Sequence, residues 1–413
     1  MNTGPPRRAV IAGGAGALAL FGLGSRAWYR GVFARATGPA YAPWDEWRGS
    51  EHDGNRRPLR SAILAASPHD TQPWLFAVSG VSLTVLADRA RHLGTFDPFR
   101  REMHLGLGCA IENLVRAAEA FGLMTNVQVA NGRLAPSPGE QPVVAARMAL
   151  GAGRSSRGPL FDAIPKRRTN RGPYREKPIA ADHLRELVGL TSGPEVRVVF
   201  VTDAAARREL GAIVVAATDR IVADPEMSTD SFRWMRTGRR EIVAHRDGVT
   251  IDASGASQLI TVVGKMLPDL GAATTDRFWL DATRDVHVAT ARVFGMLLVR
   301  DRLDMAQAIA AGRVWQRLHL ALTAQGLAAQ PLNQPIEMID RNQMLGRSDE
   351  FSPALGAFAR AGGWEPTFVF RLGYASHAAV RSPRRPLEDV VRDGNGQTLD
   401  VRVAVIKTRM PSG

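Results

Sequence analysis

The sequence predicts an α+β fold that is built twice in tandem. Runs rich in β-branched and large apolar residues at 75–78, 83–87 and 143–150 predict strands, and the apolar periodicity of about 103–122 predicts a long helix. A second helical stretch at 312–327 resembles the first. The chain of 413 residues is long enough for two domain-sized units.

The two helical stretches support the duplication in detail. Residues 108–123 can be laid without gaps on residues 312–327, and both stretches place a glycine where a helix C-cap requires one. The shared apolar positions are Leu114 with Leu318, Ala117 with Ala321, and Ala120 with Ala324. Their spacing of three or four residues suits one buried helix face. Amphipathic helices can also resemble one another by chance, and that is the alternative explanation. We prefer the interpretation that the two stretches arose by tandem duplication.

These patterns give a division of the chain into segments. The predicted segments are a signal or anchor at 1–36, a linker at 37–57, module 1 at 58–157, module 2 at 164–393 with an insert at 225–281, and a tail at 394–413. Within module 1, residues 59–66 are predicted to be helical and to end before Pro68. In module 2, residues 367–372 are predicted to form a strand.

The N-terminus carries a candidate targeting segment. Arg7 and Arg8 precede the apolar run 9–23, which is shorter than the roughly 20 residues that span a bilayer comfortably. Twin arginines before such a run resemble a Tat export signal, and 34–36 has the small-x-small form of a cleavage site. The expected location is therefore the periplasm or cell envelope by a Tat-like route, with an uncleaved anchor or a cytoplasmic protein as alternatives.

Composition disfavours several classes of partner and chemistry. The net charge of +13 comes with only four lysines and with arginines spread along the chain, which favours an Arg-biased composition over a nucleic-acid-binding stripe. Cys109 is the only cysteine, so no intramolecular disulfide can form. The nine histidines show no i, i+4 pair that would predict a metal site. We expect no nucleic-acid partner and no metal.

The most informative local sequence is 67–74, Ser-Pro-His-Asp-Thr-Gln-Pro-Trp. Hydroxyl, amide and indole groups cluster there on a turn that Pro68 stiffens, and Thr71 and Gln72 can offer hydrogen bonds to the edge of a flat polar ligand. The alternative is an ordinary capped turn that leads into a strand. The stretch resembles the Ser-Pro-x-x-x-Gln-Pro-Trp segment of the nitroreductase superfamily of flavin enzymes.

That resemblance continues through module 2 in the family's order. Residues 167–174 resemble its Arg-x-Ser-x-Arg-x-aromatic opening, 326–333 its segment beside flavin N5 and O4, 367–374 its last core strand, and 384–388 its C-terminal Arg segment. The resemblance implies that FMN is bound by Ser67, Pro68, His69, Asp70, Gln72, Arg167, Thr169, Arg171, Gln330, Pro331, Leu332, Asn333 and Arg384. It names no catalytic side chain. Guanidinium groups suit phosphate oxygens and flavin carbonyls.

The motifs are divided between the modules. The turn at 67–74 lies in module 1 and the arginine segments in module 2, whereas family members that dimerise draw residues for each flavin from both subunits. The resemblance, which is nearest to the Acg-like tandem subgroup, implies modules with mixed or antiparallel sheets flanked by helices. It also implies one complete FMN site across an intrachain pseudo-dimer, and hence a monomer.

Two departures bear on function. Asp70 stands where the family usually has Asn, so its carboxylate would oppose the negative charge of a reduced flavin unless Arg167 or Arg171 neutralises it. Asn333 stands where many members have Glu, which leaves its side-chain role open. The insert at 225–281 is either a lid over the flavin or an added peripheral helix pair.

The leading functional expectation is an FMN-dependent oxidoreductase. NAD(P)H would supply hydride to the flavin, and a small nitroaromatic or quinone-like acceptor would be reduced in the same site. The alternative is a non-enzymatic protein that binds or sequesters FMN under a lid. A third hypothesis is that the chain is an exported binding protein without flavin.

Overall fold

The computed structural model describes residues 25–28, 30–32, 35–136, 139–191, 193–267, 271–359 and 362–393. The Tat-like residues Arg7 and Arg8, the apolar run 9–23 and the tail 394–413 lie outside these residues. None of the helices in the described ranges is both long and apolar enough to cross a bilayer.

The first sheet is mixed and is built mainly from module 1. Its strand order is β11-β1-β2-β4-β3, and only the β11–β1 pair is parallel. The strands are β1 (Trp74–Ser79), β2 (Ser82–Ala87), β3 (Leu123–Val129), β4 (Val143–Ala152) and β11 (Val391–Arg392). Strand β11 belongs to the C-terminal end of the predicted module 2, so the chain returns to the first sheet after completing the second.

The second sheet is antiparallel, with the strand order β5-β8-β10-β9. Its strands are β5 (Arg197–Val201), β8 (Val293–Val299), β9 (Ala328–Pro331) and β10 (Glu365–Gly373). Every residue of β8 is buried, which explains its unbroken apolar sequence. The expected α+β class with mixed and antiparallel sheets is confirmed.

Two long helices, α3 (Arg101–Ala120) and α11 (Met305–Ala324), join the halves of the molecule. They pack closely because each has a glycine at the crossing. A Cβ added to Gly108 would lie 2.1 Å from the carbonyl oxygen of Ile309, and one added to Gly312 would lie 2.0 Å from that of Leu105. Each glycine thus meets the carbonyl three residues before the other glycine, which is a two-fold relation between the aligned positions.

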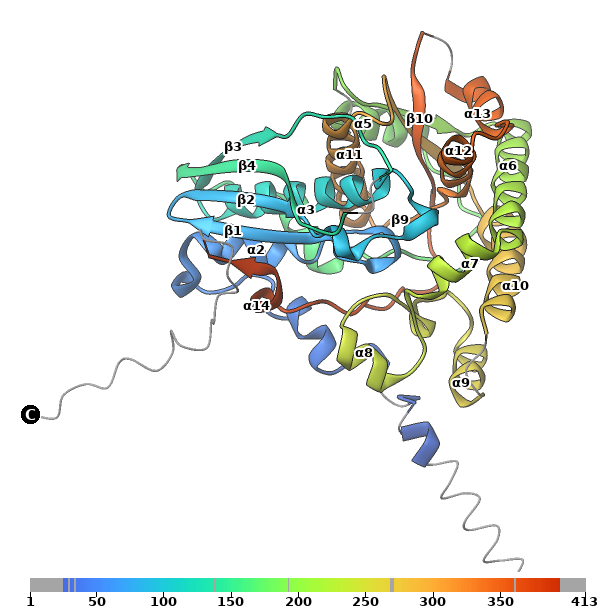
Figure 1. The fold of residues 1–413 in the computed structure, drawn as a ribbon, viewed down its shortest axis with the longest axis horizontal. Helices are drawn as coiled ribbons and strands as arrows, with labels where there is room; N and C mark the ends of the chain where they lie inside the picture. The colour runs from blue at the N-terminus through green and yellow to red at the C-terminus, as the bar shows by residue number, and fades with distance from the viewer. Residues whose placement is uncertain are drawn as a thin grey trace, which may run out of the picture.

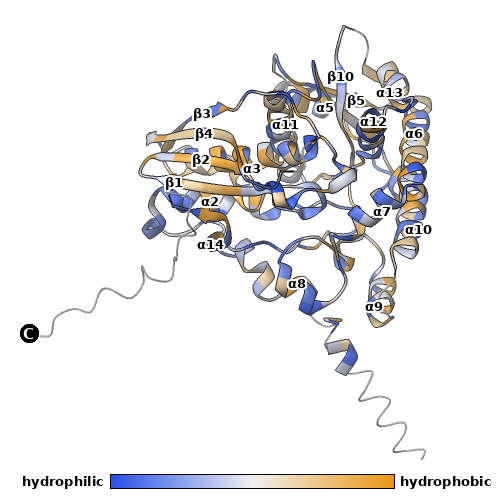
Figure 2. Ribbon diagram, viewed as in Figure 1, coloured by the Kyte–Doolittle hydropathy of each residue, from blue (hydrophilic) through white to orange (hydrophobic). Residues whose placement is uncertain are grey.

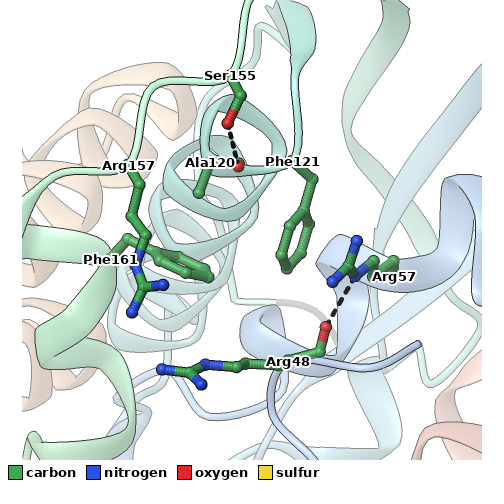
Figure 3. A pocket seen from close by; sticks show the side chains of 7 residues that line it. All are labelled: Arg48, Arg57, Ala120, Phe121, Ser155, Arg157 and Phe161. Carbon is green, nitrogen blue, oxygen red and sulfur yellow. Dashed lines mark hydrogen bonds between the residues drawn. The ribbon is translucent and has the colours of Figure 1, made fainter. Parts of the chain in front are cut away.

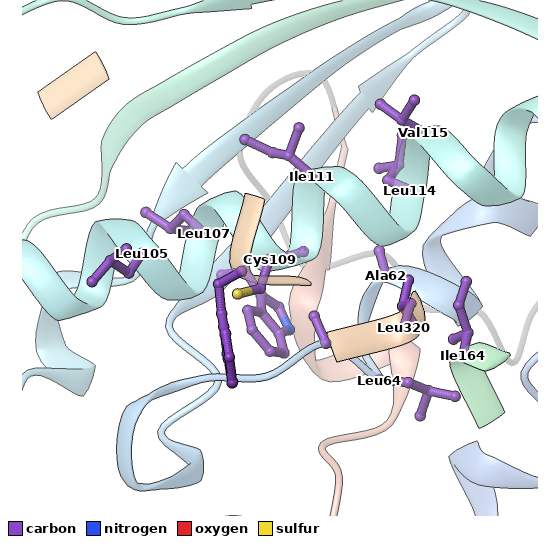
Figure 4. Close-up of a cluster of buried hydrophobic side chains, with 14 of the residues drawn as sticks. Ala62, Leu64, Leu105, Leu107, Cys109, Ile111, Leu114, Val115, Ile164 and Leu320 are labelled. Carbon is purple, nitrogen blue, oxygen red and sulfur yellow. The ribbon is translucent and has the colours of Figure 1, made fainter. Parts of the chain in front are cut away.

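The largest apolar core surrounds this helix pair and includes side chains from both halves (Figure 4). Segment 37–57, expected as a linker, is packed against this core. It forms the 3₁₀ helices η1 (Pro39–Trp44) and η2 (Glu51–Arg56), and Tyr41, Trp44 and Trp47 are buried. Its aromatic residues are therefore core residues.

The remaining helices cover the sheets and form the insert (Figure 1). They are α2 (Arg57–Ala62), α4 (Pro159–Ala163), α5 (Ala181–Thr191), α6 (Ala204–Ala223), α7 (Pro225–Phe232), α8 (Arg239–His245), α9 (Gln258–Met266), α10 (Ala272–Ala282), α12 (Gln334–Leu345), α13 (Phe351–Ala359) and α14 (Leu387–Val390). The insert also contains the strand pair β6 (Met235–Arg236) and β7 (Val249–Thr250). Helix α2 ends four residues before the predicted end of the 59–66 helix, and the chain continues there in turns.

Candidate functional site

The turn at 67–74 has a strained backbone. His69, Asp70 and Gln72 have φ values of 45°, 55° and 50°, in the left-handed region that non-glycine residues seldom occupy. Such conformations cost of order 1–3 kcal/mol each and persist only where surrounding contacts hold them. Three of them within four residues, between α2 and β1, mark this turn as a candidate functional site.

Gln72 holds the turn in place. Its Nε2 donates to the carbonyl oxygen of Arg246 at 2.9 Å, and its Oε1 accepts from the backbone N–H of Arg385 at 2.8 Å. The Ser67 hydroxyl accepts from the backbone N–H of Gln72 at 3.0 Å. The Gln72 side chain therefore bonds to the protein itself, whereas the buried Thr71 hydroxyl has no hydrogen-bond partner among the described residues.

Asp70 is neutralised by an arginine that we did not expect in that role. Arg384 forms an ion pair with Asp70 Oδ1, so the expected pairing with Arg167 or Arg171 is replaced by one with the C-terminal arginine segment. Arg384 is 1% exposed, and its Nη2 also donates to the carbonyl oxygen of Ala65 at 3.1 Å. Because Asp70 lies in module 1 and Arg384 in module 2, this pair joins the two halves at the turn.

Positive charge exceeds negative charge in this buried cluster. Burial raises the pKa of Asp70 to about 7 although Arg384 opposes the shift. Burial, and then the charge of Arg384, lower the pKa of Arg167 to about 10, and burial lowers the pKa values of Arg171 and Arg384. Three arginines therefore face the single carboxyl group of Asp70, and the other nearby carboxylate, Asp247, is paired with Arg91 and Arg236. This excess of buried positive charge favours binding of an anion.

The cluster also has unused hydrogen-bonding capacity. Within the described residues, the buried atoms Asp70 Oδ2, Arg167 Nε and Arg384 Nε have no hydrogen-bond partner. Arg167 makes one contact, from Nη2 to the carbonyl oxygen of Leu64 at 3.3 Å, and Arg171 donates to the carbonyl oxygen of Ala253 at 3.1 Å. Buried polar atoms normally form at least one hydrogen bond, so three such atoms without a partner are consistent with a site that binds a polar ligand.

Thr169 and strand β9 lie side by side next to this cluster. Thr169 pairs with Ala329 in a parallel bridge, which brings the segment at 167–171 beside Gln330 and Pro331. Gln330 Oε1 accepts from Arg371 Nε at 2.8 Å, and Arg371 Nη2 donates to the carbonyl oxygen of Gly172 at 2.7 Å. The structure therefore brings three of the four predicted module 2 segments together, namely 167–174, 326–333 and 367–374.

The side chains of Leu332 and Asn333 are occupied elsewhere. Leu332 is fully buried in the second apolar core. Asn333 Nδ2 donates to Glu102, and its Oδ1 accepts from the backbone N–H of Val369 at 3.2 Å. At these two positions, neither side chain is directed to a ligand near the cluster.

The insert packs directly on the turn. The Gly248 N–H donates to the carbonyl oxygen of Asp70 at 3.2 Å, and His69 Nε2 lies 3.0 Å from Ser231 Oγ. A Cβ at Gly255 would lie 2.3 Å from the carbonyl carbon of Arg171. These contacts come from several parts of the insert, so it covers the turn and Arg171 more closely than a peripheral helix pair would.

A buried carboxylate network lies beyond Asn333. Asp97 accepts hydrogen bonds from the first-turn N–H groups of Glu102 and Met103 in α3, and the fully buried Arg101 pairs with Asp340 at 2.7 Å. Burial raises the pKa of Asp97 to about 7 and raises the pKa of Glu102. Among the described residues, no group of His, Cys, Asp or Glu side chains is arranged to hold a metal ion.

We expect Glu337→Gln to reduce the dependence of stability on pH. Burial, then the charge of Glu102, raise the pKa of Glu337 well above its usual value, so the folded state holds a proton that the unfolded state releases from about pH 4 upward. This proton stabilises the protein at low pH, and its contribution is lost as the pH rises towards the folded-state pKa. Urea unfolding at pH 5 and pH 8 should show a smaller loss of stability in Glu337→Gln than in the wild type. Glu186→Gln on exposed α5 should match the wild type; equal slopes in all three proteins would contradict the assignment.

Three residues of the site, Trp44, Arg168 and Arg371, were not predicted from the sequence. Arg168 and Arg384 both stack on Trp44, with guanidinium carbons 3.9 Å and 4.9 Å from the ring centroid. Arg371 is fully buried and ties β10 to the segment at 167–174. The density of aromatic residues at 41–47 was the available signal for Trp44. Nothing local distinguished Arg371 from the other arginines.

A separate surface pocket of about 400 Å³ lies away from this cluster (Figure 3). Its lining residues are Arg48, Arg57, Ala120, Phe121, Ser155, Arg157 and Phe161. It shares no residue with the turn or with the arginine segments. It therefore does not take part in the candidate site.

The donor set fits the anionic part of a nucleotide cofactor. Arg167, Arg171 and Arg384 supply buried positive charge, the first and last retain unpartnered Nε atoms, and Thr169 lies beside them on the same segment. Guanidinium and hydroxyl donors suit phosphate oxygens. Only the arginines and Thr169 are assigned to the ligand here, because the side chains of Gln72, Gln330 and Asn333 form hydrogen bonds with protein groups.

These features define an α+β protein with a candidate anion site where two sheet-and-helix halves meet. No family model matches the chain. Two proteins of Mycobacterium tuberculosis, from strains CDC 1551 and H37Rv, are each 28% identical over 353 residues, covering 81% of this chain and 90% of theirs. Both carry the name putative NAD(P)H nitroreductase, and this similarity over most of both chains supports the nitroreductase-superfamily resemblance of the motifs.

Solved structures of nitroreductases are also similar, though weakly. The FMN-dependent nitroreductase NfnB of Mycobacterium smegmatis, in complex with NADPH, is 19% identical with a TM-score of 0.35, covering 57% of this chain and 97% of that one. A protein of Anabaena variabilis described as a putative nitroreductase is 11% identical with a TM-score of 0.41, covering 71% of this chain and 69% of that one.

Proposed function

We propose that this chain is an FMN-dependent oxidoreductase of the nitroreductase type, with NAD(P)H as the reductant. The observation that carries the proposal is the buried excess of positive charge where the strained turn of module 1 meets Arg167, Arg171 and Arg384 of module 2. The nitroreductase names of the mycobacterial relatives support it.

Each part of the cluster has a role in this proposal. Arg167 and Arg384 would bind the phosphate through their free Nε atoms, and Thr169 and Arg171 would bind the phosphate and the pyrimidine side of the cofactor. When bound, FMN would accept hydride from NAD(P)H and reduce a small nitroaromatic or quinone-like acceptor. The Ser67–Gln72 turn, fixed by Gln72, would position the cofactor without reorganisation.

The proposal includes a tandem duplication with one composite site in a monomer. The two-fold relation of Gly108 and Gly312 at the α3–α11 crossing is the arrangement expected of two duplicated halves. Asp70 and Arg384, which come from different halves, form the ion pair at the turn. Sedimentation velocity tests whether one chain completes the site, and we expect a monomer that retains its flavin. A dimer that loses flavin when it dissociates would contradict a site completed within one chain.

A second candidate function is storage or sequestration of FMN without turnover. The contacts of Gly248 and Ser231 with the turn favour it, because a closed insert would restrict the entry of an acceptor. NAD(P)H oxidation by the FMN-loaded protein, measured with menadione and with nitrofurazone as acceptors, separates the two. Turnover with either acceptor supports the oxidoreductase. Bound FMN that neither NADH nor NADPH reduces would favour storage.

A further inference from the structure

Helix α9 exposes an apolar face that no described residue covers. Leu259, Ile260 and Val263 are 73%, 59% and 48% exposed, and Leu267, directly after the helix, is 45% exposed. With about 3.6 residues per turn, these spacings place the three helical residues on one side. The other side is anchored, because Thr261 and Lys265 are buried. Exposed apolar side chains gathered on one helix face indicate an interaction surface.

The first described residues of the chain extend this face. Trp28 is 63% exposed, and Arg26 donates from Nε and Nη2 to the carbonyl oxygens of Met266 and Leu267, both at 2.9 Å. Residues 25–28 therefore lie against the C-terminal end of α9. In Figure 1 they lie at the same end of the molecule as α8 and α9, and Figure 2 shows apolar residues along α9.

The charges beside this face are positive. Arg26 lies at the end of α9, and Arg239 lies 5.9 Å from the ring centroid of Trp28. Helix α9 contains no acidic residue, and its one lysine, Lys265, is buried against Asp252 at 2.7 Å. An apolar helix face flanked by arginines and an exposed tryptophan is the combination that binds the interface of an anionic bilayer.

The sequence has a second apolar element next to these residues along the chain. The run at 9–23 ends just before Ser25, which begins the segment that contacts α9. A lipid surface that meets this run would thus be within reach of the α9 face. An anionic bilayer could bury the exposed apolar side chains and the apolar run among its acyl chains, and its headgroups could pair with the flanking arginines.

We propose that Trp28 and the α9 face, Leu259, Ile260, Val263 and Leu267, dock on the surface of an anionic lipid bilayer. The helix would lie in the plane of the interface, with its apolar side among the acyl chains and Arg26 and Arg239 at the headgroups. This attachment is separate from the candidate cofactor site. It would orient the protein on the membrane without a spanning helix in the described chain.

The direct test places an environment-sensitive fluorophore on the face of the full-length protein. Ile260→Cys can be labelled selectively with a nitrobenzoxadiazole (NBD) probe, because Cys109 is the only native cysteine and is buried. Adding vesicles of phosphatidylcholine and phosphatidylglycerol at 3:1 should shift the emission to the blue and increase it about twofold or more, as for a probe that enters the interface. Met124→Cys, 63% exposed on β3 away from α9, is the matched control and should not respond.

A variant without the apolar face tests its contribution to binding. Leu259→Gln/Ile260→Gln/Val263→Gln should lower the affinity for these vesicles about tenfold in flotation assays, and pure phosphatidylcholine vesicles should bind the wild type more weakly. Val81→Gln/Met124→Gln, which changes exposed apolar residues of the first sheet, should bind like the wild type. Circular dichroism and thermal unfolding establish that each variant is folded.

Three outcomes would overturn the proposal. The first is an unshifted NBD signal at residue 260 while the protein floats with vesicles, which would assign binding to another segment. The second is unchanged affinity in the folded triple variant. The third is a lipid-free dimer in sedimentation velocity that the triple variant abolishes, which would assign this face to a second copy of the chain.

Discussion

Gly312→Ala is expected to destabilise the protein by about 3 kcal/mol although alanine favours helices. The added Cβ would lie 2.0 Å from the carbonyl oxygen of Leu105 and 2.8 Å from its Cα. Both are backbone atoms of a buried helix, so no side-chain rotation can relieve the overlap and α3 must move away from α11. The same movement would separate the turn of module 1 from the arginines of module 2, so the variant should also lose cofactor binding.

Urea unfolding followed by circular dichroism measures this effect. Gly189→Ala is the matched control, because Gly189 lies in exposed α5 and no atom is within 4 Å of its added Cβ. That substitution should stabilise the protein by roughly 0.5–1 kcal/mol through helix propensity alone. If Gly312→Ala proved as stable as Gly189→Ala, the close crossing of the two helices would be incorrect.

Arg167→Ala is expected to weaken FMN binding by about 10- to 100-fold. A charge-assisted hydrogen bond to a phosphate contributes roughly 1.5–3 kcal/mol, and each 1.4 kcal/mol is a factor of ten in affinity. The effect on the stability of the ligand-free protein should be smaller, because Arg167 makes only one protein hydrogen bond among the described residues and its charge is already disfavoured by burial.

Quenching of flavin fluorescence during titration measures the affinity. Arg167→Lys keeps the charge but loses the forked geometry, so it should bind with intermediate affinity. Arg185→Ala, on the exposed surface of α5, should bind FMN like the wild type. FMN affinity that is unchanged in the folded Arg167→Ala protein would place the phosphate elsewhere.

The sequence predicted the elements whose apolar patterns are long and continuous. Strands β1, β2, β4 and β10 and helix α3 begin within two residues of the predicted starts. Helix α11 begins seven residues before the predicted stretch 312–327 and includes it as far as Ala324. Strand β3 was missed because Leu123–Val129 is exposed at alternate positions, has no continuous apolar run and begins within three residues of the end of α3. Strand β11 has only two residues, so no periodicity could reveal it.

The candidate site was predictable in its charges but not in its pairings. The motifs indicated which arginines would gather near the turn. Which of them would neutralise Asp70 depends on how the chain returns to the first sheet after β10, and Arg384 arrives there just before α14 and β11. The hydrogen bonds that hold the Gln72 side chain likewise depend on Arg246 of the insert and on Arg385, which are far away in the sequence.

The visible absorption spectrum of the purified full-length chain is the most direct test of the composite cofactor site. We expect flavin bands and about one FMN released per chain, because the two halves together form one cluster of buried arginines beside one strained turn. A folded, colourless protein that takes up no FMN on reconstitution would contradict it.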